Sequence, residues 1–385
     1  MQLICFGRDL TAMVRRMAYA RLHVWMLITL ALWPSVSSAV VLPEERADVL
    51  FHYYDGGGVT VSGPAILARK SVSDTVSMSA RYYVDMISSA SIDVVTTASP
   101  YRDKRTEYGV SLDYLHDKSL MSFSYTTSKE NDYLSDTYGI NLSHDLFGGL
   151  TTATFGYSHG QDTVMRVDTS FQDVVDRHQF RAGLNQIVTR RLMVGVSYEG
   201  VTENGFLNNP YRSVRIGLSF PGGARSEVYP RARDSQAIAF RGILGLGNDQ
   251  RPLVRSLRAE YRYFQDTWDI SAHTLIFGVQ RYFGDRWSGE FRYRYYQQSA
   301  ASFYADLFPT EFLYMARDKE LSTFHSHSFG IKSNWQFLKR PQFRSSLGLS
   351  LDYMKFEYDD FSDPLTGELY SFNAIVGQLF LSFWY

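Results

Sequence analysis

The sequence predicts an all-β protein, a transmembrane antiparallel up-and-down β-barrel of about 16 strands, with roughly 14 to 18 acceptable. Segments of about ten alternating residues recur along the chain, and after the N-terminal region none approaches the ~18 uninterrupted apolar residues of a helical span. The last stretch, Gly377–Tyr385, places Leu379, Leu381 and Phe383 on one side of a strand. At an open sheet edge in water this strand would promote aggregation, whereas in a closed barrel it pairs with the first strand.

The N-terminal region is typical of a secretory signal peptide. Arg15, Arg16 and Arg21 precede an apolar run at 22–33, and small residues ending at Ala39 follow. A retained transmembrane helix is the alternative, but the run is shorter than the ~20 residues that a span requires. We therefore expect a signal peptide at 1–39, cleaved after Ala39. Because no Pro/Gly/Ser linker divides the rest, 40–385 is predicted to be a single barrel domain rather than two soluble β domains.

Charge and cysteine content argue against a nucleic-acid-binding protein and against a disulfide-linked or acylated one. The formal charge of −1 becomes −4 when 1–39, which carries four arginines and one aspartate, is removed. This balance does not predict nucleic-acid binding. The single cysteine, Cys5, leaves with the signal peptide, so the mature chain has no thiol for a disulfide or an acyl anchor.

Strand segments show which face is apolar. Apolar and polar residues alternate at 108–114, 121–125, 153–158, 192–199 and 346–353. The polar positions are rich in Gly and Ser, and the apolar positions end in Tyr or Phe. A membrane barrel with its apolar face outward accounts for this better than a soluble sandwich.

The connections fall into two classes that largely alternate along the chain. The short ones are 116–119, 145–149, 189–191, 248–252, 284–286 and 338–341. The long ones are 85–103, 161–174, 202–234, 299–322 and 357–370. With both termini periplasmic, this alternation places the first strand at 48–54 and gives about 16 strands. The 202–234 connection has room for a further hairpin.

Several runs of the mature sequence are similar to one protein family. They are 53–59, 63–64, 82–95, 206–215, 266–268, 285–287, 293–296 and 316–322. Together they resemble the Gram-negative outer-membrane family catalogued as domain of unknown function 3570. The similarity covers nearly the whole mature chain, and the sequence departs from it at 216–223. The resemblance implies an outer-membrane protein without established catalytic residues, and a gene neighbourhood with a periplasmic flavin transferase that implies a redox context.

Charged residues on the polar faces are the candidate pore-lining residues. Later strands supply Arg241, Arg258, Glu260, Arg262, Glu290, Arg292 and Arg294, a local charge of +3. Early strands supply Arg81, Glu107, Asp113, Arg181 and Glu199, a local charge of −1. A basic wall facing an acidic wall would create a field across a water-filled lumen. The alternative is that these charges pair across neighbouring strands, because charge on the lipid face costs ~2–4 kcal/mol near the midplane.

The connection 85–103 is a candidate constriction loop. It is rich in Ser, Ala, Thr and Val and carries little charge between Met86 and Tyr101. One hypothesis folds it inward as in porins, with Asp85 and Asp93 near the narrowest point. The other is a surface loop that ends near Pro100.

Two motifs could indicate chemistry, and each has a plainer interpretation. Gly156–Gly160 matches G-x-S-x-G, but no helix pattern follows, so the nucleophile elbow cannot form. Gly56–Gly58 lacks the Lys-Ser/Thr of a phosphate loop and predicts a tight hairpin.

Two groups of possible metal ligands give equally weak evidence for a metal site. His325 and His327 share one face of a strand, but no third ligand is near them in the sequence. Asp359, Asp360 and Asp363 could bind Ca²⁺ or bridge lipopolysaccharide, but they lack EF-hand spacing. No metal, cofactor or catalytic residue is predicted.

These observations predict a porin-like channel for small polar or charged solutes and not an enzyme, in the outer membrane of a Gram-negative bacterium. The alternative is a plugged barrel that acts as scaffold or receptor for a periplasmic or surface partner, possibly in a flavin- or redox-linked system. The expected partners are membrane lipid, lipopolysaccharide and the assembly machinery that recognises the C-terminal strand, with no nucleic acid.

Overall fold

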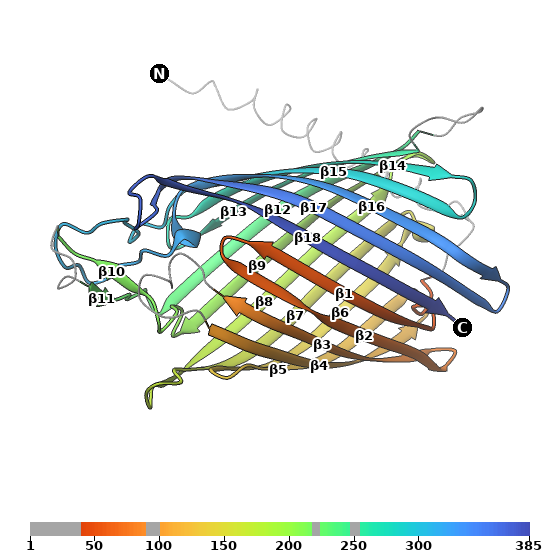
Figure 1. Cartoon of the computed structure of the whole chain (residues 1–385). Coiled ribbons are helices and arrows are strands. Elements are labelled where there is room, and N and C mark those ends of the chain that lie inside the picture. The colour runs from red at the N-terminus through yellow and green to blue at the C-terminus, as the bar shows by residue number, and fades with distance from the viewer. Residues whose placement is uncertain (1–39, 90–100, 218–223, 247–254) are drawn as a thin grey trace, which may run out of the picture.

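A computed structural model of the chain describes residues 40–89, 101–217, 224–246 and 255–385. It contains one closed antiparallel β-barrel of 16 strands and a separate two-stranded sheet (Figure 1). The predicted fold class and strand number are therefore confirmed. The predicted signal peptide, with Ala39, lies outside the described residues.

Barrel strands that follow one another in the sequence pair with each other, β9 pairs with β12 because the small sheet lies between them in the sequence, and β1 pairs with β18. The first barrel strands are β1 (Arg46–Gly56), β2 (Val59–Ser73), β3 (Val76–Ser89), β4 (Tyr101–His116), β5 (Ser119–Lys129), β6 (Tyr133–Leu146), β7 (Thr151–Met165), β8 (Gln172–Ile187) and β9 (Leu192–Gly205). The remaining ones are β12 (Ala232–Gly245), β13 (Ser256–Asp266), β14 (Ser271–Phe283), β15 (Trp287–Gln298), β16 (Phe324–Arg340), β17 (Phe343–Ser362) and β18 (Leu369–Trp384).

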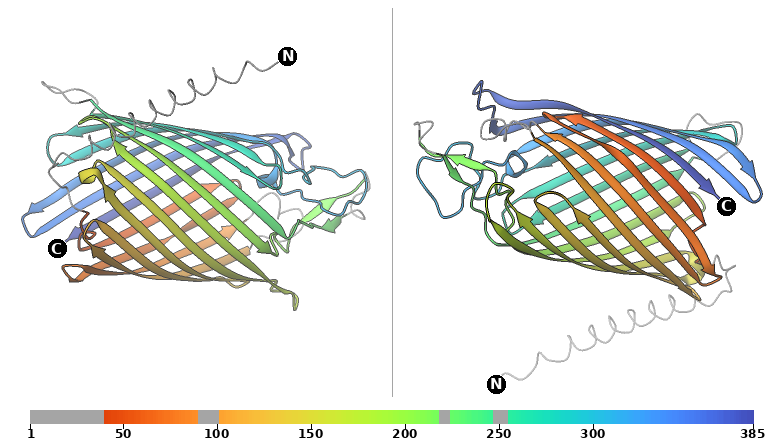
Figure 2. Two further views of the ribbon diagram at one scale, coloured as in Figure 1. Left: turned by 180° about the vertical axis from the view of Figure 1, so that it is seen from behind. Right: turned by 60° about the horizontal axis from the view of Figure 1, so that its bottom comes forward.

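The C-terminal strand closes the barrel, as the sequence predicts. β18 pairs with β1 from Arg46 opposite Trp384 to Gly56 opposite Ala374, and it pairs with β17 on its other side. In Figure 2 the two ends of the sheet meet in one continuous wall. The apolar strand at the end of the chain therefore leaves no free edge.

The two ends of the barrel differ in their connections. The terminus end carries both ends of the barrel chain and short connections, such as the turn between β4 and β5, where Asp117 has φ 50°. The opposite end, here called the loop end, carries the long connections together with the tight β1–β2 turn. In that turn Gly57 and Gly58 have φ of 59° and 80°, values that favour glycine. The predicted tight hairpin is confirmed.

Apolar side chains cover the outside of the barrel. Tyr114, Phe155 and Leu349 are 39%, 59% and 47% exposed, and alternate residues on the same strands face the interior. Among the described residues, no helix combines the length and apolarity needed to cross a bilayer. The orientation expected of a membrane barrel, apolar outside and polar inside, is therefore observed.

Long connections form a structured cap at the loop end (Figure 1). Between β9 and β12 the short strands β10 (Ser213–Arg215) and β11 (Ala224–Ser226) pair outside the barrel, so the 202–234 connection does contain a further hairpin-like unit. The connection between β15 and β16 contains the 3₁₀ turn η2 (Lys319–Leu321). Val228 pairs with Met315, which joins the two connections. A second 3₁₀ turn, η1 (Phe147–Gly149), lies at the terminus end.

Candidate functional site

The inner face of the barrel is lined by ion pairs between strands. Ten of the twelve candidate pore-lining residues form ion pairs, nine of them with a residue on another strand and Arg258 with Glu260 on its own strand. Among the hypotheses for these charges, pairing across neighbouring strands is therefore what the geometry supports. A simple basic wall opposite an acidic wall does not describe the lumen.

Glu260 on β13 holds two arginines. Its Oε2 lies 2.9 Å from Arg241 Nε on β12 and 2.8 Å from Arg258 Nη2 on its own strand. Arg241 stands directly opposite Glu260 in the strand register, and Arg258 is two residues away on the same face. One carboxylate thus orders two guanidinium groups and leaves a local charge of +1.

Glu199 on β9 forms a second such group and connects the two predicted walls. Its carboxylate lies 3.2 Å from Arg181 Nε on β8 and 3.4 Å from Arg262 Nη2 on β13. Arg262 and Glu199 are on strands separated by β12, so this contact crosses a whole strand on the inner face. The supposed acidic and basic walls are therefore joined by direct ion pairs.

A glycine on the inner face of one strand allows an ion pair to form over it between the two strands on either side. Arg292 on β15 and Asp352 on β17 are both opposite Gly330 of β16, and their side chains meet at 2.6 Å. A Cβ at position 330 would lie 2.2 Å from Asp352 Oδ1. The glycine-rich polar face is thus required where long charged side chains pass over a neighbouring strand.

Two of the candidates lie on the inner face without an ion pair. Within the described residues, Glu290 and Arg294 have no oppositely charged atom within ion-pair distance; Glu290 is opposite Lys332 in the register. The Arg294 guanidinium lies 5.1 Å from the ring centre of Tyr296. Arg294 therefore contributes an unpaired positive charge to the lumen.

In most of these ion pairs the arginine is more exposed than the carboxylate; in the Arg262–Glu199 pair the two are equally exposed, at 35% and 36%. Arg81 is 48% exposed and Glu107 is 12% exposed; Arg292 is 46% exposed and Asp352 is 10% exposed. The arginine is also the more exposed partner in three further pairs, Arg241–Glu260, Arg258–Glu260 and Arg181–Glu199. The surface that these pairs present to the lumen is therefore formed mainly by guanidinium groups.

Asp85 is part of the β3 wall, and Asp93 lies outside the described residues. Asp85 Oδ1 lies 2.7 Å from His52 Nε2, and the His52 ring stacks on Tyr83 at 4.9 Å. His52 stands opposite Gly63, which separates it from β3 in the same way that Gly330 separates Arg292 from Asp352. The described part of 85–103 thus places Asp85 in a buried pair within the barrel wall.

Further lumen charges escaped the sequence analysis. Arg69 pairs with Asp113 across β3, Arg105 pairs with Glu107 at 2.8 Å, and Arg177 contacts both Asp162 and Glu203. Each of these residues has the parity of an inward position, so strand alternation was the available signal. What the sequence did not give was the register between strands, which decides the partners.

A cavity of about 430 Å³ opens at the loop end, here called the vestibule. The β5–β6 connection contributes Glu130 and Asp132 to its wall, and β8 contributes Arg177. The other charged residues that line it are Asp103, Glu203, Arg212, Arg233, Asp318 and Glu320. The vestibule is therefore a polar space of mixed charge at the entrance to the lumen.

The cap that borders the vestibule has a dry core. Trp268 and Phe303 pack edge to face at 5.1 Å, and both contact Tyr229. The Tyr229 hydroxyl donates to Glu227 Oε2 at 2.6 Å. Burial first, and then the nearby Glu227, raise the pKa of Tyr229 well above its ordinary value, so the phenol stays neutral. The cap is a folded unit with its own core.

The G-x-S-x-G match and the acidic group of the β17–β18 region both have ordinary structural roles. Ser158 of the G-x-S-x-G match lies inside strand β7 and contacts Gln179 at 3.3 Å, so there is no nucleophile elbow. Asp360 accepts from the Thr323 backbone N–H, and Asp363 accepts from the Leu365 backbone N–H.

The expectation that His325 and His327 lack a third ligand was wrong. Glu357 on β17 is directly opposite His325, and its carboxylate lies 3.6 Å from His325 Nε2. These three residues can approach one ion together. Sequence distance hid the third residue, because it comes from the next strand.

A closed antiparallel barrel with an apolar outer face and a charged inner face defines an outer-membrane-type β-barrel protein. The family model described as Protein of unknown function (DUF3570) matches residues 92–182 and 172–360. The chain belongs to this family, which confirms the resemblance seen in the sequence. A comparison with curated proteins gives no significant sequence match.

Solved structures of outer-membrane proteins are similar in fold. A bacterial polysaccharide outer membrane secretin has a TM-score of 0.52 and 10% identity, with 89% of this chain and 99% of that one covered. The outer membrane protein opdK from Pseudomonas aeruginosa gives 0.41 and 9%, covering 89% and 100%. The siderophore receptor PirA from the same organism gives 0.41 and 10%, with 82% of this chain covered, and the chain spans only 57% of that receptor's length. At these identities the similarity concerns the fold alone.

Proposed function

We propose that the protein is a channel of the Gram-negative outer membrane that passes small polar solutes and prefers anions. The observation that carries the proposal is the arrangement of guanidinium groups above carboxylates on the inner face. Arg181, Arg241 and Arg292 are 56%, 47% and 46% exposed, although each has a carboxylate partner. Rings of arginine in a pore favour anions.

The paired carboxylates set the geometry of this surface. Glu260 and Glu199 each hold two arginines, which fixes long side chains that would otherwise lose conformational freedom on binding a solute. An anion passing the wall exchanges contacts with water for contacts with several guanidinium groups in turn. Shared, partly neutralised arginines bind it weakly enough for release, which conduction requires.

The proposal includes the expected surroundings of the barrel. Both termini face the periplasm, the loop end faces outward, and lipid and lipopolysaccharide surround the apolar face. The assembly machinery recognises the C-terminal strand. The mechanism needs no catalytic residue and no cofactor.

Planar-bilayer recording of the purified protein tests the channel. We expect discrete conductance steps and a reversal potential in a KCl gradient that indicates chloride preference. Arg294→Glu places a carboxylate where a cation without an ion-pair partner stands, so the preference should shift toward potassium. Arg190→Glu, in the exposed β8–β9 turn, makes the same charge change outside the strands and serves as control. Folded protein that never conducts would refute the proposal.

A receptor or scaffold is the second candidate, and the cap favours it. Seven buried residues from three connections form a continuous core at the mouth, which is more structure than a simple opening requires. Such a surface suits recognition of an external partner. A stable partner recovered by crosslinking on whole cells, together with absent conductance, would support this candidate over the channel.

A further inference from the structure

Histidines gather on the outer surface of the barrel near its loop end. Five of the nine histidines in the sequence lie on the outward face in the loop-end halves of four strands, namely His159, His178, His273, His325 and His327. This level of a membrane barrel is where aromatic side chains meet the membrane–water interface.

Three of these histidines share one local arrangement. Tyr157 and His178, Tyr261 and His273, and Tyr293 and His327 each bring a tyrosine hydroxyl within 2.8 Å of a histidine Nδ1. In each case the histidine lies on the neighbouring strand, two residues closer to the loop end than the residue opposite the tyrosine. The tyrosine thereby fixes the ring and directs its Nε2 away from the hydroxyl.

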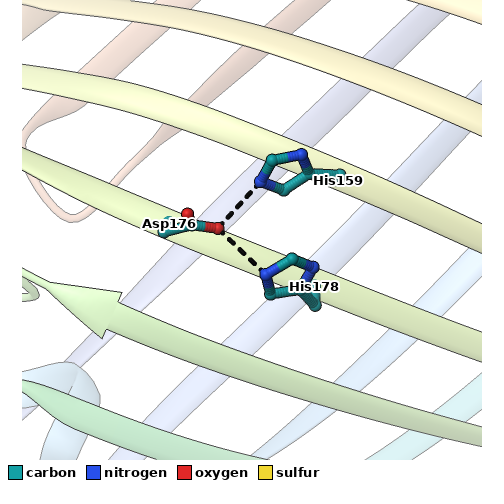
Figure 3. Close-up of side chains that lie close together, drawn as sticks. All are labelled: His159, Asp176 and His178. Carbon is teal, nitrogen blue, oxygen red and sulfur yellow. Dashed lines mark hydrogen bonds and ion pairs between the residues drawn. The ribbon is translucent and has the colours of Figure 1, made fainter.

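At one of these positions three ligand groups converge. His159 on β7 is directly opposite His178 on β8, and Asp176 lies two residues from His178 on the same face. Asp176 Oδ1 is 2.9 Å from His159 Nε2 and 3.2 Å from His178 Nε2, as Figure 3 shows. The side chains are 29%, 48% and 37% exposed for His159, Asp176 and His178, so an ion from solution can reach them.

We propose that His159, Asp176 and His178 bind a divalent first-row transition metal ion of the Zn²⁺ type. Two imidazoles and one carboxylate form a common ligand set for such an ion, and a water molecule would complete a tetrahedron. Ligand atoms about 2.1 Å from a tetrahedral metal lie roughly 3.4 Å apart, close to both measured N–O separations. The two imidazole rings are parallel with centroids 4.6 Å apart, so binding tilts their Nε2 atoms toward each other.

The tyrosine contact gives the site its outer shell. In the metal-bound state the His178 Nδ1–H donates to the Tyr157 oxygen, which leaves the Nε2 lone pair free for the ion. Tyr157 is therefore a positioning residue. The ion would join β7 to β8 in the loop-end half of the barrel wall and stabilise this part of the wall.

The chain supplies its own controls. His273 has the same tyrosine contact, with Tyr261, but no carboxylate lies within ion-pair distance of it in the described residues. The group of His325, His327 and Glu357 has a competing cation, because Lys355 Nζ lies 2.8 Å from Glu357 Oε1. Of these groups, the one at Asp176 combines two histidines with a carboxylate that, in the part of the chain that the structure describes, has no lysine or arginine within ion-pair distance.

Isothermal titration of Zn²⁺ into the chelator-washed protein in detergent, free of any histidine tag, tests the site. The protein used as the parent for all variants, here called the background protein, carries His325→Ala and His327→Ala, which removes the group of His325, His327 and Glu357 as a competing site. We expect one bound Zn²⁺, a loss of affinity greater than about 100-fold in His178→Ala and in Asp176→Asn, and a loss of about 10- to 100-fold in Tyr157→Phe. His273→Ala should bind like its parent.

A separate measurement protects the test against misfolded variants. Zn²⁺ should raise the melting temperature of the background protein and of His273→Ala, and should leave that of Asp176→Asn unchanged. Undiminished Zn²⁺ binding in both His178→Ala and Asp176→Asn, or no binding by the background protein, would overturn the proposal. Channel activity does not enter the test, so its result is independent of the proposed function.

Discussion

Arg262 on β13 reaches over β12 to Glu199 on β9, with 3.4 Å between Nη2 and Oε1. The same carboxylate also holds Arg181, so one acid shares two arginines that come from different sides of its strand. All three side chains are about a third or more exposed, and solvent screening therefore limits what the pairs add to stability.

Glu199→Gln should raise the chloride preference of the channel. The change leaves Arg181 and Arg262 without their shared acid and adds one positive charge to the lumen. The expected loss of unfolding free energy is about 1 kcal/mol or less. Reversal potentials in a KCl gradient measure the preference. Glu311→Gln, in the exposed β15–β16 connection, makes the same charge change away from the lumen, and an equal shift there would contradict the prediction.

Gly330→Ala should break the Arg292–Asp352 pair. The added methyl group would lie 2.2 Å from Asp352 Oδ1, so the carboxylate has to leave its partner. Because Asp352 is 10% exposed, the displaced charge should lower the free energy of unfolding by about 1–3 kcal/mol. Urea unfolding in detergent or vesicles, followed by tryptophan fluorescence, measures this.

Two further variants define the cause of the Gly330→Ala effect. Gly242→Ala is the matched control, since a Cβ there meets nothing within 4 Å. Asp352→Asn removes the displaced charge, so adding Gly330→Ala to it should cost less than adding Gly330→Ala to the parent. Equal costs in both backgrounds would show that the charge pair is not responsible.

The sequence was sufficient for the fold and for the inward faces, because both depend on a two-residue period that is visible in one strand. The ion-pair partners, in contrast, depend on the register between neighbouring strands. Glu199 and Arg262 are 63 positions apart, and only the pairing of three strands brings them together. Glu357 was missed as a neighbour of His325 for the same reason. The cap core around Trp268 had no periodic signal, because its residues come from irregular connections.

Trp268→Ala should loosen the cap without unfolding the barrel. The substitution empties the centre of the cluster that includes Tyr229 and Phe303, and a buried tryptophan truncated to alanine costs about 3–5 kcal/mol. Arg317 and Lys319, which are 6% and 8% exposed in the folded cap, should become accessible to trypsin. Mass spectrometry of the digest detects cleavage at both positions.

The same digest separates a loosened cap from a general effect. Leu313→Ala, at a site 78% exposed in the same connection, should leave both sites protected. Cleavage of the variant within the barrel strands would show that the barrel itself depends on Trp268. Continued protection of Arg317 and Lys319 in Trp268→Ala would contradict the role of the cluster.

Glu130 should make the channel respond to pH. It lies in the β5–β6 connection at the vestibule, where burial first, and then Asp103 and Asp132, raise its pKa above the ordinary 4.5, while Arg105 opposes the shift. As pH falls through this raised pKa, Glu130 takes up a proton and the vestibule loses a negative charge. Chloride preference should therefore increase on acidification, beginning above the pH at which an ordinary glutamate titrates. Glu130→Gln, which is neutral throughout, should have the higher preference already at neutral pH and a flatter profile. Reversal potentials recorded between about pH 7 and about pH 5 measure both, and profiles that coincide for parent and variant would assign the pH response to another group.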